Sequence, residues 1–317
     1  MTSASDENRP RVSLGMPVYN DADLVGSAIA SLQEQTFGDF ELIISDNAST
    51  DGTSKTCLAA AERDPRIRYF RHETNGGQAA NFEFTLTESR GEFFAWACSD
   101  DAWDSRFIER LLSALEAAPE AIGSFGPFAM TDKGGKINET RNFDYSGSWP
   151  LQRLYALCWH WDDGHEYGLF RRERLRGLSF PKWWGPNRPS PYDISYPVLF
   201  FILARGEIVS VDGAPLLLKR RRGGAFHYQA GGANIVTWYL CKLLLSLNLL
   251  LFALVWTRRG GHSLPLSLGV LPPVAARVAS LSLAPLPGLI RYGLSRTVRV
   301  VFGESGLATL RRVLLKK

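Results

Sequence analysis

The sequence is poor in cysteine, methionine and histidine, and these shortages argue against several classes of protein. Its 317 residues include four cysteines, three methionines and five histidines. The cysteines are far apart and no Cys-X-X-Cys pair occurs, which argues against a disulfide framework and a thiolate zinc site. We therefore expect reduced thiols in a cytosolic compartment. Residues 1–10 are polar and lack the apolar core of a secretory signal, so we expect a disordered tail there.

Acidic residues are almost absent from the last third of the chain. Residues 219–317 hold fifteen lysines and arginines against one acid, Glu304, whereas residues 1–218 hold 21 basic and 31 acidic side chains. Leucines are interleaved with the basic residues. This composition favours an anionic membrane surface over nucleic acid as a partner of the basic region. We expect two parts, a catalytic or binding domain at 11–222 and an apolar, basic region at 223–317.

Long apolar runs without a charge are also lacking. The longest apolar segment, 236–256, has about the length needed to span a bilayer, but Lys242 and Asn248 interrupt it. A charged side chain at the bilayer centre costs about 2.5–3.5 kcal/mol on insertion scales. We therefore expect 223–317 to be mainly helical and to lie at a membrane interface or against the first domain, with a spanning helix as the less favoured alternative.

The first half alternates between short apolar runs and segments with apolar residues at helical spacing. Strands are predicted at 11–19, 40–45, 66–72 and 92–97, and helices at 21–35, 54–61, 76–89 and 105–118. A strand near 167–175 is followed by a buried helix and further strands between 193 and 221. This alternation predicts an α/β, Rossmann-like fold with a mostly parallel sheet flanked by helices.

Polar clusters follow three of the predicted strands. They are "PVYN" at 17–20, "SDNASTDGT" at 45–53 and "SDD" at 99–101. The carboxyl ends of parallel strands meet at one edge of a sheet, and ligands bind there in open α/β folds. The adjacent acids Asp100 and Asp101 would repel each other less with a divalent cation beside them, and Mg²⁺ or Mn²⁺ suits oxygen ligands. The alternative is a solvated turn that caps the next helix.

Four segments together resemble a known family. "SLGMPVYN", "ELIISDNASTDGT", "NGGQAANF" and "WACSDDAW", in this order, are similar to the inverting family 2 glycosyltransferases of GT-A fold. The resemblance covers roughly 11–222. It implies an enzyme of the hexosyltransferase type that moves one sugar from a nucleotide-diphosphate donor, with Mn²⁺ or Mg²⁺ as cofactor. The Gln-X-X-Arg-Trp motif of processive members is absent, which favours one sugar per encounter.

The resemblance also implies roles at the donor site. Asp101 would ligate the metal, and Asp100 would contact the ribose or share the ion. Asp46 would accept the imide hydrogen of the base, which favours UDP or dTDP, because an ionised carboxylate only accepts hydrogen bonds. Ser99 stands where the family's Asp-X-Asp motif has its first acid. The other residues expected to bind the nucleotide sugar are Pro17, Tyr19, Asn20, Asn75 and Gly77, although packing is an equal alternative for Tyr19.

Inversion by a single displacement needs a base that takes the proton of the acceptor hydroxyl. By resemblance this base stands at the start of a helix after the acceptor-side strand, which points to Asp193. Tyr192 stands where the family commonly has Glu, and Asp193 could instead only cap its helix. Asp163 and Glu166 are the alternative bases.

The acceptor and the location are inferred from the basic region. The cluster "LKRRRGG" at 218–224 could clamp a diphosphate through guanidinium groups, or form a solvated or membrane-facing surface. We expect a saccharide or polyprenyl- or lipid-linked acceptor, used in cell-surface polysaccharide or glycolipid synthesis on the cytoplasmic face of a membrane. The competing hypotheses are a nucleotidyltransferase, which would need a Gly-rich, Arg-containing loop after the first strand, and a non-catalytic nucleotide-binding protein at a membrane surface.

Overall fold

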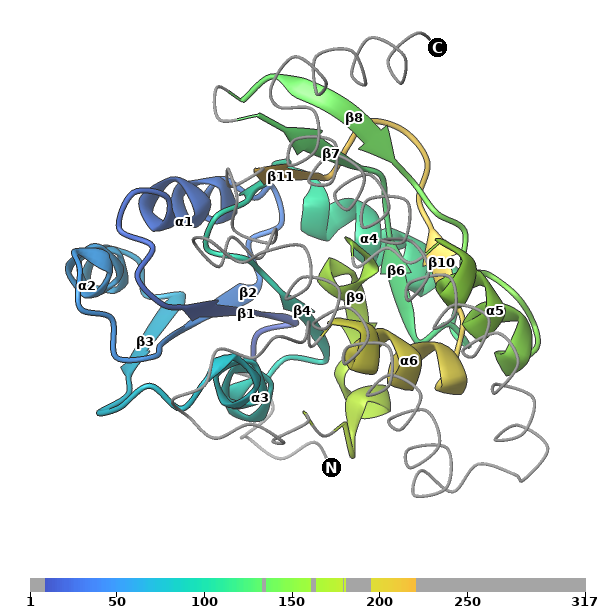
Figure 1. Ribbon diagram of the computed structural model, residues 1–317, viewed down its shortest axis with the longest axis horizontal. Helices are drawn as coiled ribbons and strands as arrows, with labels where there is room; N and C mark the ends of the chain where they lie inside the picture. Colours follow the sequence, from blue (N-terminus) through green and yellow to red (C-terminus); the bar gives the residue numbers. More distant parts are fainter. Residues whose placement is uncertain (1–8, 133–134, 161–163, 179, 181–194, 221–317) are drawn as a thin grey trace, which may run out of the picture. The chain divides into compact units, whose positions relative to one another are not determined.

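A computed structural model of the chain describes residues 9–132, 135–160, 164–178, 180 and 195–220 (Figure 1). The chain divides into two compact units, Met1–Gly223 and Gly224–Lys317. The second unit lies outside the described residues, and so do the apolar segment 236–256 and residues 1–8 of the predicted tail. The predictions for the basic region therefore remain predictions, and the elements named below all belong to the first unit.

A seven-stranded sheet forms the centre of the first unit. Its strands lie in the order β10-β6-β9-β4-β1-β2-β3, and all pairs are parallel except those of β9 with β4 and β6. The bounds are β1 Val12–Val18, β2 Phe40–Asp46, β3 Ile67–Arg71, β4 Phe93–Trp96, β6 Gly123–Phe125, β9 Leu169–Arg171 and β10 Ile208–Ser210. Every residue of β2 and β4 is buried, as expected for strands covered on both faces. The predicted α/β fold with a mostly parallel sheet is confirmed.

Helices cover both faces of this sheet. Figure 1 views the sheet nearly edge-on, with α1 and α4 on one side and α3 and α6 on the other. The helices are α1 Val25–Gln33, α2 Thr53–Arg63, α3 Gln78–Glu88, α4 Phe107–Ala117, α5 Pro150–His160 and α6 Ser195–Arg205, and the 3₁₀ turns are η1 Gly164–Tyr167 and η2 Arg172–Leu175. In α4 the buried residues Phe107, Leu111 and Leu115 recur every fourth position, which places them on one face.

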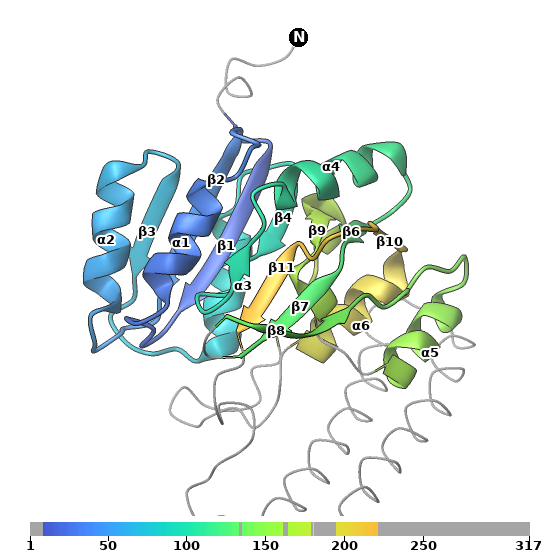
Figure 2. The same cartoon turned by 90° about the horizontal axis from the view of Figure 1, so that it is seen from above.

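A second, smaller sheet lies beside the first (Figure 2). Its strands are β5 Ala102–Trp103, β7 Phe128–Thr131, β8 Ile137–Arg141 and β11 Leu217–Arg220, in the order β5-β11-β7-β8. Strand β11 runs antiparallel to β5, with Leu218 opposite Ala102. This sheet was not predicted. It brings the end of the first unit against the segment that follows the paired acids.

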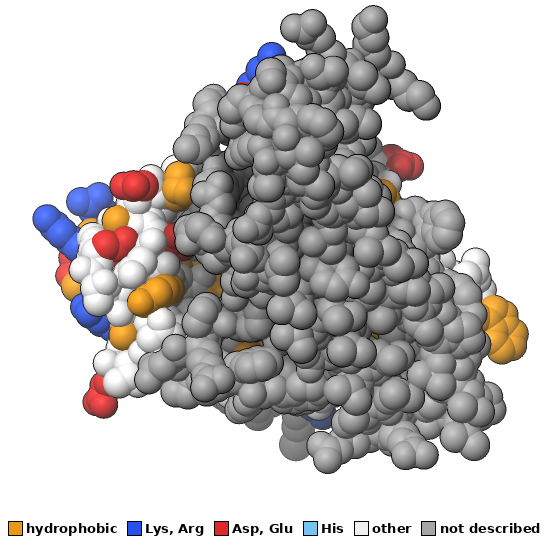
Figure 3. All heavy atoms as spheres, in the orientation of Figure 1, with side chains coloured by type: hydrophobic (Ala, Val, Ile, Leu, Met, Phe, Trp, Pro, Cys, Tyr) orange, Lys and Arg blue, Asp and Glu red, His pale blue; other side chains and the backbone are white. Residues whose placement is uncertain are grey.

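Charged side chains are mixed over the described surface at the left of Figure 3, where α2 and β3 lie in Figure 1. Both signs of charge occur there, and the apolar side chains between them are scattered rather than gathered in one broad patch. Among the residues that the structure describes, no helix is at once long enough and apolar enough to cross a membrane.

A buried ion network joins the first residues of the central strands. The Glu41 carboxylate, 3% exposed, accepts hydrogen bonds from Ser13 Oγ at 2.7 Å, Arg68 Nη1 at 3.1 Å and Arg90 Nη2 at 2.8 Å. Burial by itself raises the pKa of Glu41, but the hydrogen bonds from Ser13, Arg90 and Arg68 outweigh it and hold the pKa below the ordinary 4.5. A depressed pKa means that Glu41 stabilises the fold above pH 4.5 and that this contribution is lost as the pH falls through its pKa in the folded protein.

We therefore expect Glu41→Gln to lower the free energy of unfolding by about 2–3 kcal/mol at pH 7, because the buried acceptor of the bonds from Ser13, Arg68 and Arg90 loses its charge. Urea unfolding at pH 7 and at pH 4 measures this, and the difference between variant and wild type should shrink at the lower pH. The control is Glu88→Gln, since Glu88 also pairs with Arg68 but its side chain is 34% exposed. An equal loss for Glu41→Gln at both pH values would refute the electrostatic explanation.

Candidate active site

The loops that follow β1 and β2 are tied together at the carboxyl edge of the sheet. The backbone N–H of Asn20 donates to Ser49 Oγ at 3.0 Å, and the Asn20 side chain accepts from the Thr50 N–H at 2.8 Å. The N–H of Asp21 donates to Thr53 Oγ1 at 2.7 Å. These bonds hold the two loops in one arrangement before any ligand arrives, which reduces the entropic cost of binding.

Asn47 connects this pair of loops to the loop after β3. It is 5% exposed, and its Nδ2 donates to Asn75 Oδ1 at 2.9 Å and to the Gly77 carbonyl at 3.2 Å, while its Oδ1 accepts from the Gly76 N–H at 2.9 Å. Gly77 precedes α3 with φ of 88°, a left-handed conformation that favours glycine. The amino terminus of α3, which attracts anionic groups, is thus held at the same edge.

Two residues without glycine's freedom also adopt the left-handed conformation here. Asn20 has φ of 53° and Ala48 has φ of 60°, and they follow β1 and β2 respectively. For alanine this conformation costs about 1–2 kcal/mol. Backbone strain of this kind gathers at functional sites, where the surrounding structure imposes it. Its presence in two adjacent loops marks this edge as the candidate site.

Asp46 lies beneath these loops rather than on their surface. Its carboxylate is fully buried and accepts from the Ser49 N–H at 2.8 Å, Ser54 Oγ at 2.5 Å and Tyr69 Oη at 2.8 Å. Burial raises the pKa of Asp46, but these hydrogen bonds prevail and hold it below the ordinary 3.8. In this structure the carboxylate is buried and already accepts three hydrogen bonds. The predicted contact between Asp46 and the base stays a prediction.

The other residues expected at the donor site lie at the same edge. Pro17 belongs to β1 and pairs in register with Ser45 of β2. Tyr19 is 45% exposed, so its ring is available to a flat ligand, and Asn20 is exposed beside it. Asn75 and Gly77 stand in the loop after β3, joined to Asn47. The structure therefore brings together residues from three separate segments of the sequence.

The paired acids follow β4 at this edge and come with a third donor. Donor atoms of Cys98, Asp100 and Asp101 lie within 4.8 Å of one another. Asp101 is 3% exposed and Asp100 is half-buried. Two carboxylates supply the hard oxygen ligands that Mg²⁺ and Mn²⁺ prefer, whereas the thiol is a softer ligand. The residues therefore fit a divalent cation.

The neighbours of this cluster define its electrostatics. Burial raises the pKa of the Cys98 thiol well above its ordinary value, the charges of Asp101 and Asp100 raise it further, and the Tyr167 hydroxyl and Lys219 act in the opposite sense. The thiol is protonated at neutral pH under these conditions, and it donates to Tyr167 Oη at 2.9 Å. Ser99 is 5% exposed and donates to the carboxylate of Asp21, which connects the cluster to the loop after β1.

Lys219 brings a positive charge to the acids. Leu218 of β11 pairs with Ala102 of β5, so Lys219 is the next residue along β11 in the direction of Asp101. Its ammonium lies 4.9 Å from the centre of the Tyr167 ring. The basic cluster 218–224 was noted in the sequence as a possible clamp for a diphosphate. Among its described residues, Lys219 is the one that the second sheet brings toward the acids. The side chains beyond Lys219 lie outside the described residues.

The candidate bases are only partly covered by the structure. Asp193 and Asp163 lie outside the described residues, so the assignment of Asp193 as the base stays a prediction. Glu166 belongs to η1 and is fully buried, so an acceptor arriving from solvent does not reach it in this conformation. Glu166 as an alternative base therefore also stays a prediction.

Fold and site together define a class of protein. The sheet is mostly parallel, the loops at its carboxyl edge are joined, and two acids that fit a cation lie at that edge, which is where ligands bind in open α/β folds. The sequence profile of Glycosyl transferase family 2 matches residues 13–177, about half of the chain. The chain belongs to this family, as its motifs predicted.

Curated relatives carry the same kind of name. An uncharacterized glycosyltransferase of Rickettsia bellii is 32% identical over 40% of this chain and 18% of its own length. A putative teichuronic acid biosynthesis glycosyltransferase of Bacillus subtilis, TuaG, is 29% identical over 41% of this chain and 52% of its own length. The chain spans less than a quarter of the length of three Rickettsia relatives, at 18, 21 and 23%.

Solved structures share the fold at low sequence identity. S. aureus TarS 1–349 in complex with UDP-GlcNAc has a TM-score of 0.59 at 17% identity, covering 94% of this chain and 78% of its own. The mannosyltransferase PcManGT from Pyrobaculum calidifontis, in complex with GDP-Man and Mn²⁺, has a TM-score of 0.53 at 19% identity, covering 98% and 89%. These likenesses confirm the predicted GT-A fold.

Proposed function

We propose that this protein moves one sugar, with inversion, from a nucleotide-diphosphate donor to a saccharide or lipid-linked acceptor. The observation that carries this proposal is the convergence of Asp100 and Asp101 with the three joined loops at the carboxyl edge of the sheet. A nucleotide sugar needs both features, a surface for its nucleoside and a place where the charge of its diphosphate is balanced. Membership of Glycosyl transferase family 2 supports glycosyl transfer as the reaction.

Asp101 and Asp100 are the residues that would hold the metal, Mn²⁺ or Mg²⁺. When bound, the cation acts as a Lewis acid that offsets the negative charge of the departing nucleoside diphosphate. Two further observations support a cation here. Two adjacent acids at the end of an apolar strand otherwise repel each other, and the structural neighbour PcManGT was solved with Mn²⁺. Lys219 would balance part of the remaining negative charge of the diphosphate from β11.

The nucleoside would lie along the loops after β1 and β3. The exposed ring of Tyr19 offers a stacking surface, and Asn20, Asn75 and Gly77 place polar groups beside it. We propose UDP or dTDP as the favoured nucleotide, and the UDP-GlcNAc complex of TarS supports this choice. Asp46 would mainly stabilise the loop after β2, because its carboxylate is buried and accepts a hydrogen bond from Ser54.

The acceptor hydroxyl must lose a proton as it attacks the anomeric carbon, and we assign that step to Asp193. Its carboxylate would take the proton while the bond to the diphosphate breaks, so one displacement inverts the sugar. The name of the TuaG relative supports a place in cell-surface polysaccharide synthesis. The basic region 223–317 supports a position on the cytoplasmic face of a membrane, where a lipid-linked acceptor would be found.

A thermal-unfolding panel of nucleoside diphosphates with and without Mn²⁺ tests the proposal. UDP with Mn²⁺ at about a hundred times its Kd should add about 2.7 kcal/mol of stability, which corresponds to a rise of about 5 °C or more in Tm. CDP, GDP and ADP carry the same charge as UDP and are tested separately for comparison. Because the diphosphate is proposed to bind together with the cation, the rise should need both and vanish with EDTA.

The panel also separates the remaining hypotheses. A rise with UDP and Mn²⁺ together with release of UDP from UDP-sugars supports a transferase, whereas the same rise without any turnover would favour a non-catalytic nucleotide-binding protein. No rise with any nucleoside diphosphate would refute the proposed donor class.

A further inference from the structure

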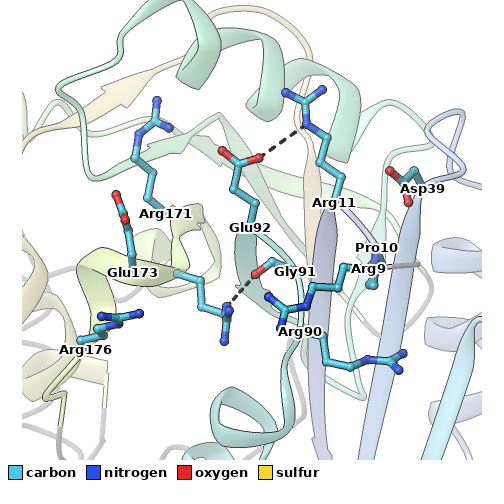
Figure 4. Close-up of a pocket in the computed structure, with 11 residues that line it drawn as sticks. Arg9, Pro10, Arg11, Asp39, Arg90, Gly91, Glu92, Arg171, Glu173 and Arg176 are labelled. Carbon is cyan, nitrogen blue, oxygen red and sulfur yellow. Dashed lines mark hydrogen bonds and ion pairs between the residues drawn. The ribbon is translucent and has the colours of Figure 1, made fainter. Parts of the chain in front are cut away.

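A cavity lies at the edge of the central sheet opposite the candidate active site, where the strands begin (Figure 4). Its volume is about 620 Å³, within the range of small-molecule sites. Arg11 immediately precedes β1, Glu92 immediately precedes β4, and Arg171 at the end of β9 pairs with Phe93. The cavity is therefore separated from the carboxyl edge by the length of the strands.

The walls of this cavity are strongly basic. Six arginines and three acids line it, and only a proline and a glycine complete the lining. Two of the arginines are matched by carboxylates, since Arg11 pairs with Glu116 and lies 4.0 Å from Glu92, and Arg90 donates to Glu41 at 2.8 Å. The scarcity of apolar groups excludes an acyl chain as the ligand, and the excess of positive charge favours an anion.

Arg171 and Arg172 are held in place by backbone carbonyls instead of acids. Arg171 donates to the carbonyls of Ala121 at 3.1 Å and Leu115 at 2.8 Å, and Arg172 to those of Gly91 at 2.6 Å and Ser89 at 3.1 Å. Carbonyl groups orient a guanidinium without neutralising it. Both arginines are half-buried, so their charges are fixed at the wall before a ligand binds.

Arg176 completes this side of the cavity. Figure 4 shows it with Arg171 and Glu173 on one side, while Arg9, Arg11 and Arg90 lie on the other. Arg176 is exposed, and its side chain forms no ion pair with any residue in the part of the chain that the structure describes. It is free to close on a ligand, and Glu173 offsets only part of the combined charge of the three neighbouring arginines.

We infer that this cavity binds phosphate groups, at a site distinct from the proposed donor site. Guanidinium groups bind phosphate oxygens through their N–H groups, and two of them held at one wall with the exposed Arg176 beside them suit a ligand with two neighbouring phosphates or a phosphodiester. The phosphate could belong to a free phosphorylated solute or to the headgroup of an anionic phospholipid. The inference does not depend on the proposed transfer reaction, since none of its residues belongs to the carboxyl edge.

Calorimetric titration of the full chain with inorganic pyrophosphate tests the inference. EDTA in the buffer and the background substitutions Asp100→Asn and Asp101→Asn silence the proposed donor site. We expect saturable binding, and Arg176→Gln should raise Kd about tenfold through loss of a charge-assisted contact. Arg174→Gln is the matched control, because Arg174 lies in the same turn, is 46% exposed and lies 4.0 Å from Glu120 outside the cavity. Neither substitution should change Tm.

Sedimentation with vesicles separates the two sources of phosphate. In this experiment the ligand is a vesicle in place of pyrophosphate. One set of vesicles contains only neutral phosphatidylcholine, and the other also contains an anionic phospholipid. If the ligand is a lipid headgroup, binding to anionic vesicles should weaken about tenfold in Arg176→Gln and should not weaken in Arg174→Gln. If the ligand is a free solute, the same difference between the two variants should appear with pyrophosphate and not with vesicles. If neither ligand binds, or if Arg176→Gln and Arg174→Gln behave alike with both, the inference is overturned.

Discussion

Replacing Asp101 by asparagine is expected to lower kcat/KM for release of UDP from a UDP-sugar by about a hundredfold or more. Asparagine is similar in size but uncharged, so the variant would keep the loop after β4 while losing a charged ligand for the cation that offsets the diphosphate charge. The measurement is UDP release at saturating Mn²⁺ with purified wild type and variant. Excess Mn²⁺ should restore little of the activity if the carboxylate also positions the ion.

Asp104→Asn is the matched control for this substitution. Asp104 lies three residues further on, where its carboxylate accepts from the Arg106 N–H at 3.0 Å at the start of α4. An asparagine can accept the same bond, so activity should stay within about twofold of wild type. Equal losses in Asp101→Asn and Asp104→Asn would mean that the loop as a whole, and not a metal ligand, was disturbed.

Replacing Asp46 by alanine is expected to lower the free energy of unfolding by about 3 kcal/mol or more. The substitution leaves the Ser49 N–H, Ser54 Oγ and Tyr69 Oη without their common acceptor in a buried place. Each bond to a charged acceptor is worth about 1.5–3 kcal/mol, although the losses do not simply add. Urea unfolding at pH 7 measures the change.

Two further variants separate the roles proposed for Asp46. Tyr69→Phe removes one of the three bonds and should cost about 1 kcal/mol without changing the Kd for UDP. Asp51→Ala removes an exposed carboxylate from the same loop, where it accepts from Ala22 and Thr53, and should cost about as much. If Asp46→Ala instead unfolds like wild type and loses only UDP binding, Asp46 acts on the base, as the family resemblance implied, and not on the loop.

The central sheet could be predicted because its strands are covered on both faces. Buried strands such as β2 and β4 are rich in apolar residues, and segments with apolar residues at helical spacing stand between the strands in the sequence. Boundaries were less exact. The helix predicted at 21–35 begins only at Val25, because a turn in which the Asp21 carbonyl accepts from Leu24 and Val25 precedes it.

The second sheet and the reversal of β9 could not be predicted from local pattern. Strand β5 has two residues, and its partner β11 comes more than a hundred residues later. The segment predicted as a strand at 167–175 contains only three strand residues before the turn η2. The helix α5 was not predicted either. Pairing between distant segments depends on the whole fold and leaves little trace in any short window.

The candidate site was predictable where its residues stand next to one another in the sequence. Asp100 and Asp101 form a contiguous signal, and so does the polar run that contains Asp46. The connections between segments were not visible, which is why the roles of Asn47 and Asp21 were missed, although Asn47 stands within one predicted motif and Asp21 directly follows another. Their roles arise from partners about thirty to eighty residues away, and only the folded chain shows those partners.

Manganese binding measured by electron paramagnetic resonance tests the central claim most directly. Free Mn²⁺ gives a six-line spectrum that weakens when the ion binds, so a titration counts sites without requiring the acceptor or the sugar to be known. UDP should bring one Mn²⁺ into wild type, and Asp100→Asn with Asp101→Asn should remove this binding while Tm stays near that of wild type. Undiminished, UDP-dependent binding of Mn²⁺ in the double variant would show that these two acids do not hold the cation.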